Sequence, residues 1–249
     1  MIIKPDNEML SYSGRIDFDD RLAPVLVYAC SSIGMKFTGT SLKAVIANHR
    51  SCWTNELGYF IDGEQKRFTL SPDEEKKTYT LAEGLSEGTH ELLLFKRMDS
   101  CHTFTFYGFE IDDGAKVLPL PEKPKRKMEF FGDSVSCGEV SEAVEYVGKP
   151  DPEHDGEYSN SWYSYAWMTA RKLNAQIHDT SQGGISLLDD TGWFAAPHYK
   201  GVESCYDKIE YHPDLDRPNH GIFHDIYHMY RCCNRTKRQS PGRLYGRRL

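Results

Sequence analysis

A proline-rich, basic segment divides the sequence into two parts with different residue patterns. Residues 118–127 read Leu-Pro-Leu-Pro-Glu-Lys-Pro-Lys-Arg-Lys, with three prolines and four basic residues. Proline lacks the backbone N–H that a helix interior or a central strand needs, so this segment is predicted to be a linker. We therefore expect one unit over residues 1–117 and a second from residue 128 onward, and a chain of 249 residues has room for both.

The first unit is predicted to be all β. Short runs rich in aromatic and β-branched residues recur between turn dipeptides such as Asp62-Gly63 and Glu83-Gly84. Within Thr103–Tyr107 polar and aromatic residues alternate, as in a strand with one buried face. No convincing amphipathic helix separates the runs, which favours a jelly-roll β-sandwich. The runs are Val25–Tyr28, Met35–Phe37, Ala44–Ile46, Tyr59–Ile61, Arg67–Leu70, Thr78–Leu81, Glu91–Phe95 and Phe104–Ile111.

The second unit begins with an α/β pattern. Met128–Phe131 is a short apolar strand, Trp162–Leu173 has helical spacing, and Ala175–Thr180 is a second candidate strand. Strand, helix and strand in this order predict a parallel sheet.

A serine follows the first of these strands, in Gly132-Asp133-Ser134-Val135-Ser136. The carboxyl end of a strand in an open α/β sheet is where ligands bind, so Ser134 is well placed to be a nucleophile. Backbone N–H groups of a helix that begins there can stabilise an oxyanion. The structural alternative is that Asp133 or Ser134 is only a helix N-cap.

These residues resemble the first block of the SGNH (GDSL-type) hydrolases. Further segments resemble carbohydrate esterase family 2: its N-terminal jelly roll in Tyr12–Phe18, and its α/β domain in Asn160–Tyr165 and Ser181–Gly184. The resemblance extends from about residue 12 to about residue 217 and implies an esterase that removes acetyl groups from xylan or other carbohydrates. It implies Ser134 as the nucleophile, with its own N–H and that of Gly184 in the oxyanion hole. Gly183 is the alternative, because one sequence does not fix the register of the glycine pair.

The same resemblance implies two blocks that we do not find. The family carries its catalytic His near the end of the α/β domain and an oxyanion-hole Asn in a Gly-x-Asn-Asp block. Cys232–Gln239 can be written with synonymous codons whose shift by one nucleotide encodes Val-Val-Ile-Gly-Gln-Asn-Asp. This sequence contains the missing Gly-x-Asn-Asp block. We therefore interpret residues 128–217 as the N-terminal part of an SGNH domain with an incomplete sheet, and residues 218–249 as an out-of-frame or disordered tail. We expect impaired activity.

Other candidate residues carry less weight. Trp162, Tyr163 and Trp193 could line a sugar-binding cleft, although helical aromatic residues more often pack in a core. His198 and His212 are possible bases, but nothing in the sequence positions them. His220, His224 and His228 share one helical face, near Cys232 and Cys233, yet spacing alone is weak evidence for zinc. We assign no metal and no cofactor.

Charge and hydropathy restrict the partners. Seven of the 30 basic residues and none of the 37 acidic residues lie between Arg231 and Leu249, so residues 1–230 are strongly acidic and would repel nucleic acid. No apolar run reaches the length of a membrane span, and the N-terminus lacks a leader pattern. Seven scattered cysteines do not suggest a disulfide framework. We expect a cytoplasmic protein that binds acetylated carbohydrate, either as an esterase or as a non-catalytic carbohydrate-binding protein, with no nucleic-acid or membrane partner.

Overall fold

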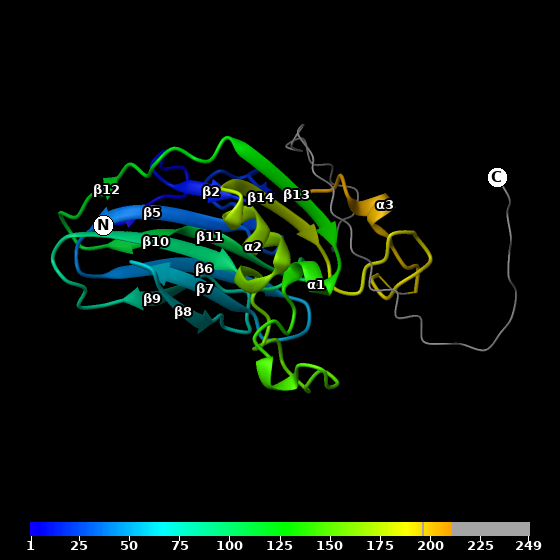
Figure 1. The fold of residues 1–249 in the computed structure, drawn as a ribbon. Coiled ribbons are helices and arrows are strands. Elements are labelled where there is room, and N and C mark those ends of the chain that lie inside the picture. Colours follow the sequence, from blue (N-terminus) through cyan, green and yellow to red (C-terminus); the bar gives the residue numbers. More distant parts are fainter. Residues whose placement is uncertain (196, 211–249) are drawn as a thin grey trace, which may run out of the picture.

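Two antiparallel sheets form the larger part of the molecule. The computed structural model describes residues 1–195 and 197–210, so His212 and the whole segment 218–249 lie outside the described residues. Within that part, the first sheet has the strand order β3-β4-β11-β6-β9 with β1 paired to β11. The second has the order β12-β5-β10-β7-β8 with β2 paired to β5. Figure 1 shows these strands as one elongated body.

The strands of these sheets are β1 (Ile2–Ile3), β2 (Ser11–Ser13), β3 (Ile16–Asp17), β4 (Val25–Leu26), β5 (Ser32–Thr38), β6 (Leu42–Arg50), β7 (Glu56–Ile61), β8 (Glu64–Thr69), β9 (Lys77–Ala82), β10 (Thr89–Lys96), β11 (His102–Ile111) and β12 (Val117–Leu118).

One apolar core lies between the two sheets. Phe104 and Phe106 of β11 and Ile46 of β6 contribute from the first sheet, and Phe37 of β5 and Leu94 of β10 from the second, all fully buried. Because a strand sends alternate side chains to opposite faces, these residues come from the inward face of each strand. The prediction that this region is rich in β-structure is confirmed.

A smaller unit with parallel strands packs beside these sheets. It contains β13 (Arg126–Gly132), α1 (Ser134–Cys137), the 3-10 turns η1 (Val144–Tyr146) and η2 (Ser161–Tyr163), α2 (Tyr165–Lys172), β14 (Ala175–Ser181) and α3 (Val202–Cys205). Strands β13 and β14 pair in parallel, from Arg126 with Ala175 to Gly132 with Ser181. In Figure 1, α2 lies over this pair.

The helix begins three residues later than the sequence pattern predicts. Asn160 caps a separate 3-10 turn by accepting a hydrogen bond from the Trp162 N–H. Ser164 then caps α2 by accepting from the Trp167 N–H. Two consecutive N-caps therefore divide one apolar stripe into two elements, because each cap residue has extended backbone angles rather than helical ones.

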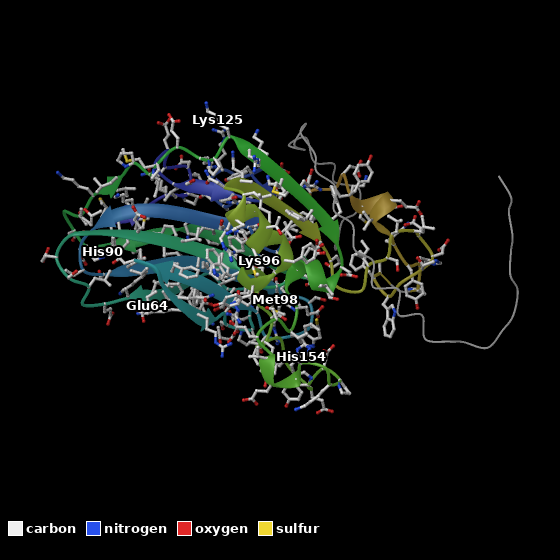
Figure 2. The ribbon with its side chains drawn as sticks, viewed as in Figure 1. Glu64, His90, Lys96, Met98, Lys125 and His154 are labelled. Atoms are coloured by element: carbon white, nitrogen blue, oxygen red, sulfur yellow. The ribbon has the colours of Figure 1, made fainter. Side chains whose placement is uncertain are left out.

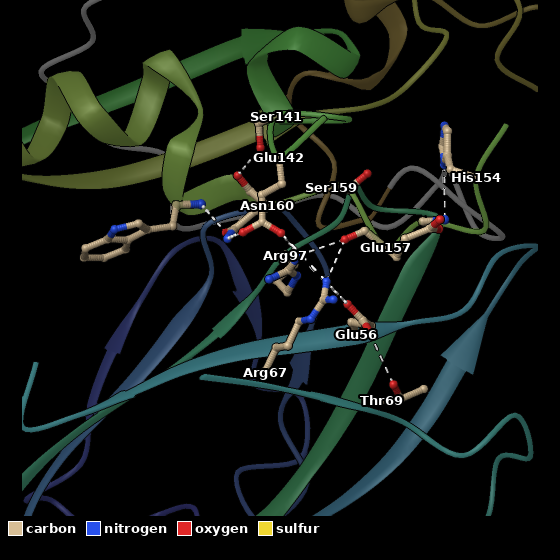
Figure 3. Close-up of polar contacts among 12 residues, drawn as sticks. Glu56, Arg67, Thr69, Arg97, Ser141, Glu142, His154, Glu157, Ser159 and Asn160 are labelled. Atoms are coloured by element: carbon tan, nitrogen blue, oxygen red, sulfur yellow. Dashed lines mark hydrogen bonds and ion pairs between the residues drawn. The ribbon is translucent and has the colours of Figure 1, made fainter. Parts of the chain in front are cut away.

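Two arginines attach the connection between α1 and α2 to the second sheet. Arg97 is 2% exposed and donates to the Glu142 carboxylate at 2.8 Å and to the Glu157 carbonyl oxygen at 3.2 Å. Arg67 on β8 donates to the same carbonyl at 2.9 Å and to Glu56 at 3.1 Å, as Figure 3 shows. These contacts hold a segment with little regular structure against the β-rich part.

A buried ion pair joins the two parts of the molecule. The Arg15 guanidinium lies 2.6 Å from the Glu129 carboxylate of β13, and the two side chains are 1% and 0% exposed. Arg15 also donates to the carbonyl oxygens of Tyr206 and Lys208, each at 2.7 Å. The start of the chain therefore contacts both the first parallel strand and the segment after α3.

We predict that Arg15→Met lowers the free energy of unfolding by about 3–5 kcal/mol, because it leaves the Glu129 carboxylate buried without its guanidinium partner. The matched control is Lys36→Met, which breaks an exposed pair with Glu91 and should cost about 0–1 kcal/mol. Urea unfolding of both variants measures the difference. Equal losses would contradict the structural role given to the Arg15–Glu129 pair.

Candidate active site

Ser134 lies at the carboxyl end of the first parallel strand. Strand β13 ends at Gly132, and Ser134 is the first residue of α1. The Asp133 carboxylate caps this short helix by accepting a hydrogen bond from the Val135 N–H at 3.1 Å. Helix α1 ends at Gly138, whose φ of 78° is in the left-handed region that favours glycine. Asp133 is thus the N-cap, and Ser134 is a half-buried residue beyond it.

The turn before Ser134 requires a glycine. A Cβ atom on Gly132 would lie 2.0 Å from the Ser136 hydroxyl oxygen, a separation that no substitution could accommodate without movement. That hydroxyl is in turn hydrogen-bonded to the Tyr165 hydroxyl of α2 at 2.8 Å. The two serines of the motif therefore have different surroundings, since Ser136 is fully buried against α2.

The carboxyl group of Glu139 lies close enough to Ser134 for the serine side chain to lower its pKa. Burial first and the nearby Asp99 carboxylate second raise the pKa of Glu139 to about 7, against the opposing effect of Ser134. A group that titrates near neutrality can take or give a proton at working pH. The sequence analysis did not identify Glu139, and its position five residues after the serine matches no spacing rule.

A carboxylate from the β-rich part lies against the glycine pair after β14. Asp99, on the connection between β10 and β11, accepts hydrogen bonds from the Gly183 N–H at 3.0 Å and from the Gln182 side-chain amide at 2.6 Å. Burial acts to raise the pKa of Asp99, but His102, the Lys96 charge and the Gly183 N–H together keep this pKa below its usual value. A Cβ on Gly183 would lie 2.7 Å from Asp99 Oδ2 and 3.3 Å from Glu139 Oε2.

Gly183 and Ser134 therefore share Glu139 as a neighbour, although they follow different strands. The Gly183 N–H, one of two predicted oxyanion donors, is already engaged by Asp99. Gly184, the other, has a φ of 76°, and its carbonyl oxygen accepts from the Trp193 N–H at 2.8 Å. The side chains of Asp99 and Glu139 also line a small cavity, together with Trp53, Met98, Cys137 and Ser159.

A buried lysine fixes the connection that carries Asp99. The Lys96 ammonium group, at the end of β10, donates to the carbonyl oxygens of Met98, at 2.6 Å, and of Asp99. Burial lowers the pKa of Lys96 to about 8. Figure 2 labels Lys96 and Met98 at this end of the strand, close to the small parallel unit.

The three predicted sugar-binding aromatic residues have different surroundings. Trp162 packs in a core cluster, with the Arg171 guanidinium 3.6 Å from its ring centroid and the Phe60 ring at 4.5 Å. Tyr163 is exposed and donates its hydroxyl to the Gln65 side chain at 2.7 Å. Trp193 is 72% exposed and follows the loop that carries Gly184. The candidate base His198 is exposed as well.

Comparison with known proteins identifies the family of proteins that this chain resembles. Residues 12–121 match the family described as "Carbohydrate esterase 2 N-terminal". The chain is 29% identical, with a TM-score of 0.70, to the structure of a family two carbohydrate esterase from Clostridium thermocellum in complex with cellohexaose, over 80% of this chain and 58% of that one. A family two carbohydrate esterase from Cellvibrio japonicus has a TM-score of 0.72 at 20% identity, over 88% and 62%, and shows the fold alone.

Curated relatives point to the same family. The chain is 33% identical to the cellulase/esterase CelE of Acetivibrio thermocellus over 77% of its own length, and 27% identical to an acetylxylan esterase / glucomannan deacetylase of Cellvibrio japonicus over 64%. It spans 23% and 44% of the length of these two relatives. The resemblance to carbohydrate esterase family 2 is confirmed.

We predict that Glu139→Gln stabilises the protein at pH 8 and has little effect at pH 5. A carboxyl group whose pKa rises from 4.5 in the unfolded chain to about 7 in the folded one keeps its proton on folding. Its ionisation therefore destabilises the native state progressively as the pH rises through this window, by roughly 3 kcal/mol above pH 7. The glutamine resembles the protonated form and avoids this cost.

The measurement is the free energy of unfolding of wild type and variant at pH 5 and pH 8. Glu145→Gln, an exposed glutamate on η1, is the control and should show the same small difference at both pH values. A pH-independent difference for Glu139→Gln would refute the raised pKa.

Proposed function

We propose that this protein belongs to a lineage of carboxylic-ester hydrolases and removes acetyl groups from carbohydrate. Its nucleophile is Ser134. The observation that carries the proposal is the position of Ser134, after the first parallel strand, at the start of α1 and beside the ionisable carboxyl group of Glu139. The relatives support the substrate class, because they are named as acetylxylan esterases and one is described with a bound cello-oligosaccharide.

The same proposal covers the domain organisation. We assign residues 1–117 to a jelly-roll β-sandwich, residues 118–127 to the linker and residues 128–217 to the N-terminal part of an SGNH domain. The core shared by two antiparallel sheets and the parallel pair β13–β14 support this division. Pairing of Val117–Leu118 with β5 and of Arg126–Lys127 with β14 leaves residues 119–125 as the unpaired part of the linker.

For the oxyanion hole we propose the backbone N–H groups of Ser134 and Gly184. The engagement of the Gly183 N–H by Asp99 favours Gly184 over the alternative. For the sugar we propose Trp193 as the main aromatic surface, since a large exposed ring beside the glycine loop can stack on the apolar face of a pyranose. Tyr163 remains a weaker candidate, and the packing of Trp162 argues against a direct role.

We further propose that hydrolysis by this chain is impaired. A serine hydroxyl is a poor nucleophile at neutral pH without an adjacent base, and the His-bearing block of the family is not recognisable in the sequence. Glu139 is an ionisable group beside Ser134, but it is a carboxyl group with a pKa of about 7 and not the histidine that the resemblance implies as the base. Loss of a triad member typically removes orders of magnitude of rate.

A second function is favoured by one observation. The Asp99 carboxylate on the Gly183 N–H puts a negative charge next to the position where an oxyanion would develop. Such a charge opposes catalysis but does not prevent a neutral sugar from binding. The alternative is therefore a non-catalytic carbohydrate-binding protein.

We predict that the chain hydrolyses an activated acetyl ester at a rate at least about 10²-fold below that of a version with the reading frame restored after Arg217. Ser134→Ala should abolish the remaining turnover. Ser136→Ala is the matched control, because it removes the same atom two residues away and should keep the activity.

Turnover that survives Ser134→Ala would overturn the assignment of the nucleophile. Equal rates for the chain and the repaired version would overturn the proposed impairment. Binding of cello- or xylo-oligosaccharides measured by calorimetry, with no turnover in either serine variant or in wild type, would favour the binding function.

A further inference from the structure

A second nucleophilic group lies outside the proposed esterase residues. Cys52, in the exposed turn between β6 and β7, has its Sγ atom 3.6 Å from Nε2 of His102. His102 is 1% exposed, and its Nδ1 atom lies 3.2 Å from Oδ1 of Asp99. The three side chains form a row from solvent to the interior, in the order thiol, imidazole and carboxylate. None of the three contacts the Ser134 hydroxyl.

The order thiol, imidazole and carboxylate is the arrangement that activates a thiol. Asp99 is held as a carboxylate by its hydrogen bonds, so Nδ1 of His102 is the protonated nitrogen and Nε2 faces the thiol. Burial lowers the pKa of His102, but the hydrogen bonds to Asp99 and Cys52 outweigh it and the net shift is upward. The hydrogen bond to His102 lowers the pKa of Cys52 against a smaller effect of burial. Proton transfer from sulfur to Nε2 therefore gives a thiolate beside an imidazolium.

The surroundings hold this geometry without blocking the sulfur. Trp53 stacks on the His102 ring, with centroids 6.2 Å apart and planes 10° from parallel. Arg50 donates to the Cys52 carbonyl oxygen at 3.0 Å, which fixes the turn. Within the row the Asp99 charge opposes the thiolate, and of the neighbouring groups Lys96 opposes the imidazolium while the Glu139 carboxyl group interacts with His102. The opposing effects of Asp99 and Lys96 are smaller than the hydrogen bonds that connect the row.

The other cysteines of the described residues lack such partners. Cys30 and Cys137 are buried, and burial raises the pKa of each well above its usual range. Burial also raises the pKa of Cys101 to about 12 and that of Cys205 to about 11. Cys101 lies near enough to Cys52 for the two charges to interact, so it provides a comparison with a nearby thiol that is less exposed and has no His102 partner.

We propose that Cys52 is a reactive thiolate, formed with His102 and Asp99, that is S-thiolated by low-molecular-weight disulfides. The sulfur attacks one sulfur atom of the small disulfide, a new S–S bond forms to Cys52, and the other half leaves as a thiolate. That leaving thiolate takes up the proton that His102 holds. One disulfide is exchanged for another, so no further oxidant is needed.

The test uses the full chain and oxidised glutathione, with the modified residue located by peptide mass mapping. At pH 6.5 we expect Cys52 to react about tenfold faster than a peptide of residues 50–55, because a larger fraction of the protein thiol is ionised. Cys101 should remain unmodified. His102→Asn should reduce the rate to that of the peptide, and this variant is checked for native folding by its circular dichroism spectrum.

A rate for Cys52 no greater than that of the peptide, or modification of Cys101 before Cys52, would overturn the proposal. Because His102→Asn removes a buried ring, the pH dependence of the wild-type reaction with iodoacetamide is a second measurement. Its midpoint should lie below that of the peptide thiol, and an equal or higher midpoint counts against the proposal.

Discussion

The buried ammonium group of Lys96 determines how the two parts of the molecule meet. It ends β10 and donates to the carbonyl oxygens of Met98 and Asp99, two and three residues further along the chain. An unpaired ammonium in an apolar interior is costly, so these acceptors are required and the backbone has little freedom there. The Asp99 carboxylate is thereby positioned against Gly183 and His102. One buried cation in a β-strand thus sets the polar surroundings of the loop that follows β14.

Much of the fold could be predicted because its signals are local. Alternating side chains in Thr103–Tyr107 and the prolines of the linker each act within a few residues, and the structure has strands and a connection there. The start of α2 was harder to predict from the sequence. Asn160 and Ser164 are both good N-caps, and only tertiary contacts decide that both are used.

The candidate site could be predicted only in part, for the same reason. Ser134 follows a recognisable strand within a short motif, so its position at the strand end could be inferred from sequence. Glu139 and Asp99 could not, because each acquires its role through burial and through neighbours far along the chain. Asp99 is 84 residues from Gly183, and no periodicity connects them. Cys52 and His102 lie 50 residues apart in the sequence, so no local sequence pattern predicts their contact either.

The Arg15–Glu129 pair has a consequence for how such a protein can be divided. Arg15 precedes almost every strand of the two antiparallel sheets, yet Glu129, Tyr206 and Lys208, which accept its hydrogen bonds, follow the linker. Phe95 and Cys30 of the β-rich part are likewise buried against α2 and β13. A gene fragment that stops at the linker would therefore expose a charge and an apolar surface that the complete chain covers. The two halves are adjacent modules in sequence but a single cooperative unit in folding, which restricts recombination at the proline-rich segment.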